Sequence, residues 1–296
     1  MVVRFQAAAL SCSLLAVVAC GDNQHLQEPP DAAVPVDADL SPRAVTLRFS
    51  PKVGSADFAC GQTYQHMGSE DSTITPRDFR FYVQDVELLG PGGSRTSVAL
   101  DQDGVWQYQT LALLDFENFT GGCADGTPET NLTIRGKVPP GTYTGIAFTI
   151  GVPEALNHKD LTTLPAPLNL SGLWWGWNFG HVFFAAVSHT EITTPTPGTN
   201  DHYVHVGSTE CTGEAANGET IACAKPNRPH VELTGFDPTA ASIVVDYGAM
   251  LSGSQLTTSE GCHSFEATPC TIPFSKVGLD FTTGQISAAQ TVFRAP

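Results

Sequence analysis

Short strand-like runs, separated by turn residues, dominate the sequence after about residue 44 and limit the folds open to it. Several runs alternate apolar with polar residues, as half-buried strands do. The runs are Ala44–Phe49, Phe79–Leu89, Ser97–Ala99, Leu132–Lys137, Gly145–Ile150, His181–Val187, His202–Val206, His230–Leu233, Ser242–Asp246 and Lys276–Phe281. Turn sequences such as Pro91-Gly-Gly-Ser and Pro139-Pro-Gly-Thr separate them, in agreement with a total of 28 Gly and 21 Pro.

Helical signals are few, because only Asp160–Leu164 and Tyr247–Leu251 suggest a turn or so of helix. Six of the eight cysteines lie after residue 44, and an even number in an exported protein argues for disulfides. They are Cys60, Cys123, Cys211, Cys223, Cys262 and Cys270. Six cysteines allow many pairings, and we expect sequential pairing because the last two pairs each close a short polar loop. The sequence predicts an all-β fold, a disulfide-stapled antiparallel β-sandwich with few short helices.

The N-terminus predicts export. Residues 1–19 hold one cation, Arg4, and an apolar run too short to span a membrane permanently, as in a secretory signal peptide. The ending Val17-Val-Ala-Cys20 resembles a bacterial lipoprotein cleavage box, which implies a lipidated Cys20; the alternative is an ordinary signal with a chance cysteine. Residues 20–43, rich in Pro, Ala and Asp, predict a disordered tether, and residues 44–296 one domain. We expect a periplasmic or outer-surface lipoprotein, anchored to the membrane by acyl chains.

The charge balance excludes some partners. The chain has 30 acidic against 14 basic residues and a net charge of −16, which should repel nucleic acid and anionic lipid head groups and suits a cationic partner. The sequence has no GxSxG elbow, no Walker loop and no HExxH motif, so we do not expect an enzyme. It also lacks CxxCH, so this chain binds no c-type haem of its own.

The segment Leu173–His181, LWWGWNFGH, holds three of the four tryptophans. At strand spacing Trp175 and Trp177 share one face and Trp174 lies on the other. The rings are open to three interpretations: core packing, a carbohydrate platform, or a redox-modified site near histidines. A carbohydrate platform needs flanking carboxylates and amides, and Asn178 is the only such residue near.

Histidines are numerous for a chain with little charge. The domain has His66, His158, His181, His189, His202, His205, His230 and His263. Residues three apart in a strand point to opposite faces, so we do not expect His202 and His205 to share a metal. Loop histidines brought near the tryptophans would form an imidazole site that suits copper, zinc or nickel, with no free thiolate to compete if every cysteine is in a disulfide.

The order of several short motifs resembles one known family. The motifs are Phe81-Tyr-Val-Gln-Asp-Val, Leu113-Leu-Asp-Phe-Glu, Gly151-Val-Pro-Glu-Ala-Leu-Asn-His158, Ala166-Pro-Leu-Asn, Trp175-Gly-Trp177, Val204-His-Val-Gly-Ser-Thr-Glu-Cys211 and Lys225-Pro-Asn-Arg. The series resembles the metallo-mystery-pair four-cysteine family, the MbnP-like periplasmic copper proteins of methanobactin operons and similar gene pairs. The resemblance covers about Val45 to Arg294.

The resemblance implies a copper-binding β-sandwich and a partner, an MbnH-like di-haem c-type cytochrome peroxidase-like protein that oxidises a tryptophan to kynurenine. On the family motifs, Trp175 and Trp177 are candidates for the modified ring, and His158 and His205 for copper ligands. The family usually continues Gly-Tyr-Lys-Phe where this chain has Gly180-His-Val-Phe183. This departure either adds His181 to the site or loosens its copper role. Two of the six cysteines exceed the family's four.

Taken together, the sequence predicts an exported, lipid-anchored copper-binding protein, itself not catalytic, that is the substrate of the haem partner. The alternative is a surface carbohydrate-binding or interaction lipoprotein that uses the tryptophan cluster as a stacking platform.

Overall fold

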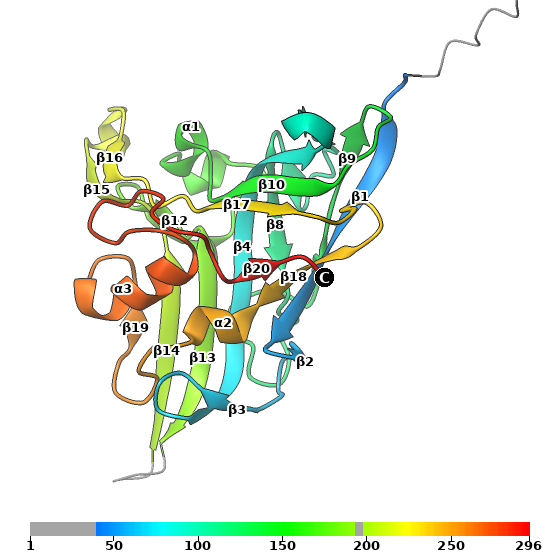
Figure 1. Cartoon of the computed structure of the whole chain (residues 1–296). Helices are drawn as coiled ribbons and strands as arrows, with labels where there is room; N and C mark the ends of the chain where they lie inside the picture. Colours follow the sequence, from blue (N-terminus) through cyan, green and yellow to red (C-terminus); the bar gives the residue numbers. More distant parts are fainter. Residues whose placement is uncertain (1–39, 193–197) are drawn as a thin grey trace, which may run out of the picture. The chain divides into compact units, whose positions relative to one another are not determined.

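A computed structural model describes residues 40–192 and 198–296 of the chain (Figure 1). The expected signal peptide, Cys20 and most of the expected tether lie outside the described residues. The first strand already begins at Arg43, the last residue assigned to the tether. Among the described residues, no helix has both the length and the apolar character needed to cross a membrane.

Two sheets carry the fold. The first has the strand order β20-β18-β1-β9-β6, with β2 beside β1. Its strands are β20 (Phe293–Arg294), β18 (Ser242–Asp246), β1 (Arg43–Val53), β9 (Thr133–Val138), β6 (Ala99–Leu100) and β2 (Ala56–Asp57). The second has the order β17-β10-β4-β13-β14-β19, with β3, β5 and β8 also paired to β4, and β7 to β8. Its strands are β17 (His230–Thr234), β10 (Gly145–Ile150), β4 (Ser72–Leu89), β13 (Phe184–Ile192), β14 (Gly198–Val206), β19 (Gly261–Cys262), β3 (Tyr64–Met67), β5 (Arg95–Ser97), β7 (Gln107–Tyr108) and β8 (Leu111–Asp115).

The prediction of antiparallel sheets is confirmed only in part, because most strand pairs are antiparallel but each of the two sheets also contains a parallel pair. β1 pairs with β18 in parallel, and β14 pairs with β19 in parallel. The two strands of each parallel pair are far apart in sequence and no tight hairpin joins them, so local turn signals carry no information on their direction. The mainly β character with few short helices is confirmed.

Short elements complete the described chain. Two small hairpins are β11 (Trp174–Gly176) with β12 (Gly180–His181), and β15 (Thr209–Thr212) with β16 (Ala222–Lys225). The helices are α1 (Glu154–Asn157), α2 (Tyr247–Leu251) and α3 (Ala267–Lys276), with 3-10 turns at Pro91–Gly93, Leu161–Thr163, Ser171–Leu173 and Ala215–Asn217.

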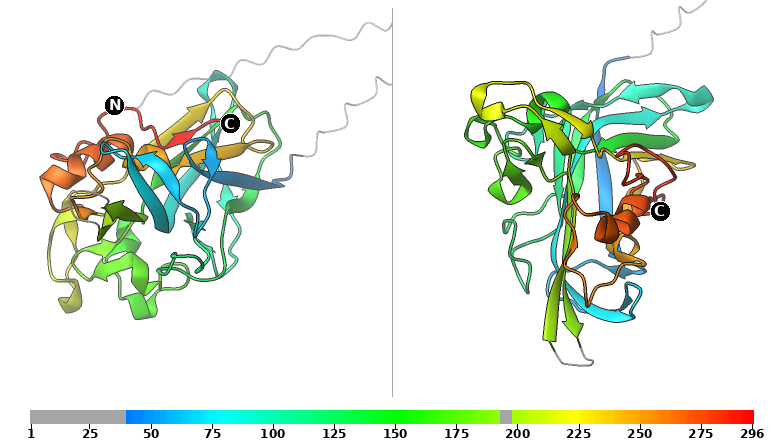
Figure 2. Two further views of the ribbon diagram at one scale, coloured as in Figure 1. Left: turned by 90° about the horizontal axis from the view of Figure 1, so that it is seen from below. Right: turned by 90° about the vertical axis from the view of Figure 1, so that its left-hand side faces the viewer.

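The strand predicted at Lys276–Phe281 is wrong, because helix α3 ends at Lys276. The sequence did not predict this helix. Its buried residues Cys270 and Phe274 pack into the core, and it lies beside β14 (Figure 2). Tertiary packing of one face and a disulfide therefore hold α3, although Pro273 lies inside it and local propensity is poor.

Aromatic rings join the two sheets. Phe49 of β1 lies 5.9 Å from Phe148 of β10, measured between ring centroids, and Phe293 of β20 lies 5.4 Å from both Phe148 and Phe81 of β4. These rings are buried, and each removes a large apolar area from water. The inner faces of the two sheets therefore share one hydrophobic core.

The six cysteines pair sequentially, in line with the expectation. Cys60–Cys123 ties the loop before β3 to the loop after β8, Cys211–Cys223 crosses the β15–β16 hairpin, and Cys262–Cys270 joins β19 to α3. Two of these bonds flank the segments that carry the candidate site described next.

A buried ionic cluster lies in the second sheet. Arg80 donates two hydrogen bonds to Asp78, of 2.7 and 2.6 Å, and the two side chains are 2% and 3% exposed. Asp115 and Glu117 lie close enough to act on both of them. The pKa of Asp115 is raised to about 8, mainly by burial; Arg80 opposes the shift, and the carboxyl groups of Asp78 and Glu117 add to it. At neutral pH Asp115 therefore holds its proton, which limits the negative charge around one guanidinium.

Candidate functional site around the tryptophan hairpin

The tryptophan segment folds as the small β11–β12 hairpin. Trp174 pairs with His181 and Gly176 with Gly180, and both glycines have positive φ angles that favour glycine. Trp177 lies in the turn and is 37% exposed. The expected sharing of one face by Trp175 and Trp177 is wrong, because strand alternation ends at Gly176. Instead the ring of Trp177 lies 6.1 Å from that of Trp174.

His205 on β14 lies beneath the other side of this hairpin. Its ring centroid is 6.1 Å from that of Trp175, 5.2 Å from that of His263 and 5.4 Å from that of Tyr203. Its Nδ1 is buried and has no hydrogen-bond partner among the described residues. Burial lowers the pKa of His205 to about 3, helped by His263 and Arg80. The imidazole is therefore neutral at neutral pH, with a buried nitrogen that is costly to leave unsatisfied.

His263 is the site residue that the sequence analysis left out of its candidates. It follows directly after β19, and the parallel pairing of Val204 with Cys262 brings it beside His205. Its ring also packs on Tyr203, with centroids 4.9 Å apart. The only local signal was its position next to a cysteine, and a contact between segments so far apart in sequence cannot be read from spacing.

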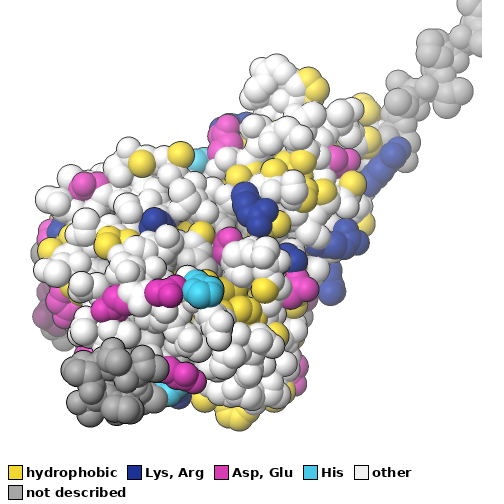
Figure 3. Space-filling view, turned by 60° about the horizontal axis from the view of Figure 1, so that its bottom comes forward, with side chains coloured by type: hydrophobic (Ala, Val, Ile, Leu, Met, Phe, Trp, Pro, Cys, Tyr) yellow, Lys and Arg dark blue, Asp and Glu magenta, His cyan; other side chains and the backbone are white. Residues whose placement is uncertain are grey.

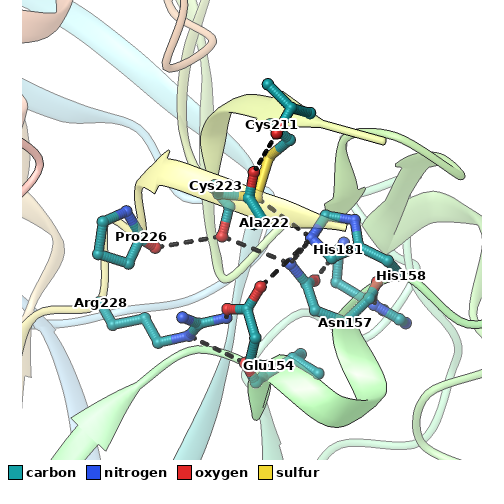
Figure 4. A network of polar contacts seen from close by, with 12 residues as sticks. Glu154, Asn157, His158, His181, Cys211, Ala222, Cys223, Pro226 and Arg228 are labelled. Carbon is teal, nitrogen blue, oxygen red and sulfur yellow. Dashed lines mark hydrogen bonds and ion pairs between the residues drawn. A yellow bond between two sulfur atoms is a disulfide. The ribbon is translucent and has the colours of Figure 1, made fainter. Parts of the chain in front are cut away.

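His158 lies on the opposite side of the hairpin, directly after α1. Its Nδ1–H donates to the carbonyl oxygen of Trp177 at 3.1 Å, and its Nε2 accepts from the amide of Asn157 at 3.0 Å (Figure 4). The Sγ of Cys223 lies 3.3 Å from Nε2. Ligand atoms of His158, Cys211 and Cys223 all lie within 4.8 Å of one another, and within the described ranges this group does not include His205. Burial lowers the pKa of His158.

His181 is fully buried and already makes several hydrogen bonds. Its backbone N–H donates to the side-chain oxygen of Asn157 at 2.8 Å. Its Nδ1 lies 3.0 Å from the carbonyl oxygen of Asn157, and its Nε2 lies 2.9 Å from that of Leu168. Carbonyl oxygens only accept hydrogen bonds, so both ring nitrogens face groups that compete with a metal. In this conformation His181 joins α1 to the hairpin, and its role as a ligand stays a prediction.

The family model described as MbnP matches residues 42–264 of the chain, which is well over half of its length. The chain belongs to the MbnP family. The solved structure of MbnP from Methylosinus trichosporium is similar, with a TM-score of 0.74 and 29% sequence identity over 85% of this chain and 97% of that chain. A search of curated proteins finds no match.

In this MbnP-family chain, Gly207 allows the ring of Trp175 to lie against β14. A Cβ atom at Gly207 would lie 2.5 Å from Cζ3 of Trp175 and 2.9 Å from the carbonyl oxygen of His181. We therefore expect Gly207→Ala to displace the ring and to lower the free energy of unfolding by about 1–3 kcal/mol, as overpacking does. Urea unfolding measures this change. Gly141→Ala is the control, because a Cβ there meets nothing closer than 3.4 Å, and equal costs for the two variants would contradict the prediction.

Acid should destabilise the metal-free protein through its buried histidines. A histidine whose folded-state pKa is lowered stays neutral when folded but takes up a proton on unfolding once the pH falls below about 6.5. Its contribution to stability is therefore present above that pH and is lost as pH falls toward the folded-state pKa. With a folded pKa of about 3, His205 alone should cost about 2 kcal/mol between pH 7 and pH 5.

Urea unfolding at the two pH values tests this expectation, with His205→Ala as the reference. His158, His181 and His202 also have lowered pKa values and remain in the variant, so the difference between the two proteins isolates His205. The variant should lose about 2 kcal/mol less than the parent over this range. An unchanged pH dependence would show that His205 titrates normally.

Proposed function

We propose that this MbnP-family chain is an exported copper-binding protein that catalyses no reaction itself. We further propose that a tryptophan of its β11–β12 hairpin is oxidised to kynurenine by an MbnH-like di-haem partner. The observation that carries the proposal is the buried, unpartnered Nδ1 of His205, beside the ring of His263 and the ring of Trp175.

The residues present suit copper. Neutral imidazole is a good ligand for copper, and a metal ion would satisfy the nitrogen of His205 that otherwise has no partner among the described residues. His205 and His263 would hold the ion, with Tyr203 packed against both rings. Bound copper supplies a positive charge and a one-electron redox couple at this place. His158 and His181 remain candidate ligands on the other side of the hairpin.

Trp175 is the better candidate for the modified ring. It is partly exposed, packs on His205, and contacts the 46% exposed Phe265 with ring centroids 5.3 Å apart. Opening its indole yields an aniline amine and a ketone, which adds a possible ligand beside the imidazoles. Trp177 is more exposed. The imidazole of His158 is hydrogen-bonded to the backbone carbonyl of Trp177 and does not stack on the Trp177 ring.

The surface at the hairpin suits a protein partner. Phe179 and Phe265 are 47% and 46% exposed and touch each other, so two aromatic rings stand beside Trp175. On the face drawn in Figure 3, acidic side chains are scattered among some basic ones, and the chain as a whole carries a net charge of −16, which favours a partner with a basic docking surface. Aromatic residues are enriched at the centres of protein interfaces.

Export and anchoring complete the proposal. Three disulfides fit an oxidising compartment outside the cytoplasm. We propose that Cys20 carries the lipid, that residues 20–43 form the tether, and that residues 44–296 form the copper-binding β-sandwich.

The test uses the protein purified from its host. Metal analysis should find copper bound to the chain, and mass spectrometry of the peptide that contains Trp175 should show the shift from tryptophan to kynurenine. Deleting the gene of the di-haem partner should leave the tryptophan intact without removing the protein. A chain with no copper and with every tryptophan unmodified in the presence of the partner would rule out the proposal.

One observation favours the carbohydrate-binding alternative. A hollow of about 510 Å³ beside Trp177 is lined also by Glu154, Asp160 and Glu219, so the fold supplies the carboxylates that the local sequence lacked. A glycan array would test it: tight binding that Trp177→Ala abolishes would favour this function, and no binding would leave copper as the function.

A further inference from the structure

The Cys211–Cys223 disulfide crosses a hairpin that holds the two cysteines opposite each other by backbone pairing. The residues directly face one another in the β15–β16 ladder, and Thr209 faces Lys225 on one side while Thr212 faces Ala222 on the other. Lys225 also forms a 2.7 Å ion pair with Glu210 in the facing strand. These contacts do not involve sulfur, so the two side chains should stay adjacent when the S–S bond is broken.

The Nε2 atom of His158 lies beside this disulfide. Because its Nδ1–H donates to the carbonyl oxygen of Trp177, its Nε2 is the unprotonated nitrogen, and it accepts from the amide of Asn157 at 3.0 Å, a hydrogen bond that a metal ion would replace. Nε2 lies 3.3 Å from the Sγ of Cys223 and, with both sulfurs, forms a group of three ligand atoms within 4.8 Å (Figure 4). A backbone acceptor on the second ring nitrogen is the usual way in which proteins orient a metal-binding histidine.

This disulfide is also the one best placed for reduction. Cys211 and Cys223 are both half-buried, so both sulfurs of this bond can be reached. In the Cys60–Cys123 bond only Cys60 is half-buried and Cys123 is 4% exposed, and Cys262 and Cys270 are both 0% exposed. Thiol–disulfide exchange requires a thiolate to reach a sulfur atom, so access favours the hairpin bond.

We propose that Cys211, Cys223 and His158 form a second metal site, which binds the soft ion Cu⁺ only after the disulfide is reduced. An exported dithiol protein would reduce the bond: its two thiols become one disulfide, the Cys211–Cys223 bond breaks, and two cysteine thiols form. Both thiols lose their protons to solvent when Cu⁺ binds, and the ion is held by two thiolates and the Nε2 of His158. Thiolate ligands select Cu⁺ over harder ions.

This site is separate from the proposed imidazole site. The latter rests on His205 and His263 and is open to copper while every disulfide is intact, whereas the hairpin site exists only after reduction. The other group of similar geometry in the described chain, Cys60, Cys123 and Glu117, has a buried sulfur and offers a hard carboxylate in place of an imidazole. Reduction therefore gives the chain a second place for copper.

The test compares the oxidised full chain with the chain treated with a limiting amount of dithiothreitol. Alkylation and peptide mapping should label Cys211 and Cys223 before the other cysteines. Titration with Cu⁺ against a colorimetric chelator should then show an additional bound equivalent, with a sulfur-to-copper absorption band in the ultraviolet. Labelling of another pair first, or reduction without additional copper, would overturn the proposal.

Variants separate this site from the imidazole site. In reduced His158→Ala, labelling should be unchanged while the additional Cu⁺ binds at least about 10–100-fold more weakly, the loss known for outer partners of a metal site. His230→Ala is the matched control and should keep the additional copper. Cys211→Ser/Cys223→Ser should lose the additional copper and the absorption band but keep the copper of the oxidised chain. If the additional copper survives this double substitution, the proposal of the hairpin site is overturned. If instead the oxidised parent chain binds no copper while the reduced chain gains the additional equivalent, only the imidazole site is contradicted.

Discussion

Replacing His205 by alanine should weaken copper binding by the oxidised chain roughly 100-fold or more, equivalent to about 2.7 kcal/mol. The reason is that His205 contributes a neutral imidazole whose buried Nδ1 has no other partner in the described part of the chain. Its low pKa, about 3, means that no proton competes with the metal near neutral pH. Competition titration with a copper chelator measures the change.

Two further variants, one in the site and one outside it, test whether the loss of affinity is specific. His263→Ala should also weaken binding, because its ring lies 5.2 Å from that of His205. His230→Ala should leave the affinity unchanged, since His230 lies on β17 and its side chain contacts Thr149 at 3.4 Å. Far-ultraviolet circular dichroism should show a retained fold in all three. Full copper affinity in both His205→Ala and His263→Ala would move the metal to the His158 side of the hairpin.

Replacing Arg80 by alanine should lower the free energy of unfolding by about 3–5 kcal/mol, since it leaves buried carboxylates without their cation. Arg80 is 2% exposed and forms a two-pronged pair with Asp78, and the carboxyl groups of Asp115 and Glu117 lie nearby. Urea unfolding with the disulfides intact measures the loss. The loss should be smaller in acid, where these carboxyl groups take up protons.

Arg77 provides the matched control for this experiment. It stands three residues earlier in β4 and forms a 2.9 Å pair with Asp201, but its side chain is 32% exposed. Arg77→Ala should therefore cost at most about 1 kcal/mol. Arg80→Lys should fall between the two, because lysine keeps the charge and loses the planar fork. Similar costs for Arg77→Ala and Arg80→Ala would show that the cluster contributes little.

Arg80 also connects the core to the candidate site. Its positive charge helps to lower the pKa of His205, and it lies under Gly172, just before the tryptophan hairpin. Arg80→Ala should therefore raise the pKa of His205 as well as destabilise the fold. Nuclear magnetic resonance titration of that imidazole would measure the change, and an unshifted pKa would show that Arg80 does not contribute to it.

Strands with clear alternation and flanking turns were predictable. The predicted runs Gly145–Ile150 and Ser242–Asp246 are observed as β10 and β18, and Tyr247–Leu251 as α2. The strand expected at Lys276–Phe281 failed because a disulfide and core contacts stabilise α3 just before it. The parallel pairings could not be predicted for a related reason: the paired strands are so distant in sequence that no local pattern indicates their contact.

The sequence by itself determined that this is a β-rich chain, because periodicity and turn residues are local properties. It left the cysteine pairing open, and the structure shows the expected sequential pairs. Its motif order indicated the MbnP family, which the family model confirms, and the motifs gave Trp175, Trp177, His158 and His205 as candidates, with His181 as a possible addition. Only the tertiary structure decided which of these meet. The β14–β19 pairing brings His263 to His205, and the hairpins bring the Cys211–Cys223 bond and the carbonyl of Trp177 to His158. Such contacts depend on backbone pairing between remote segments, which residue spacing does not encode.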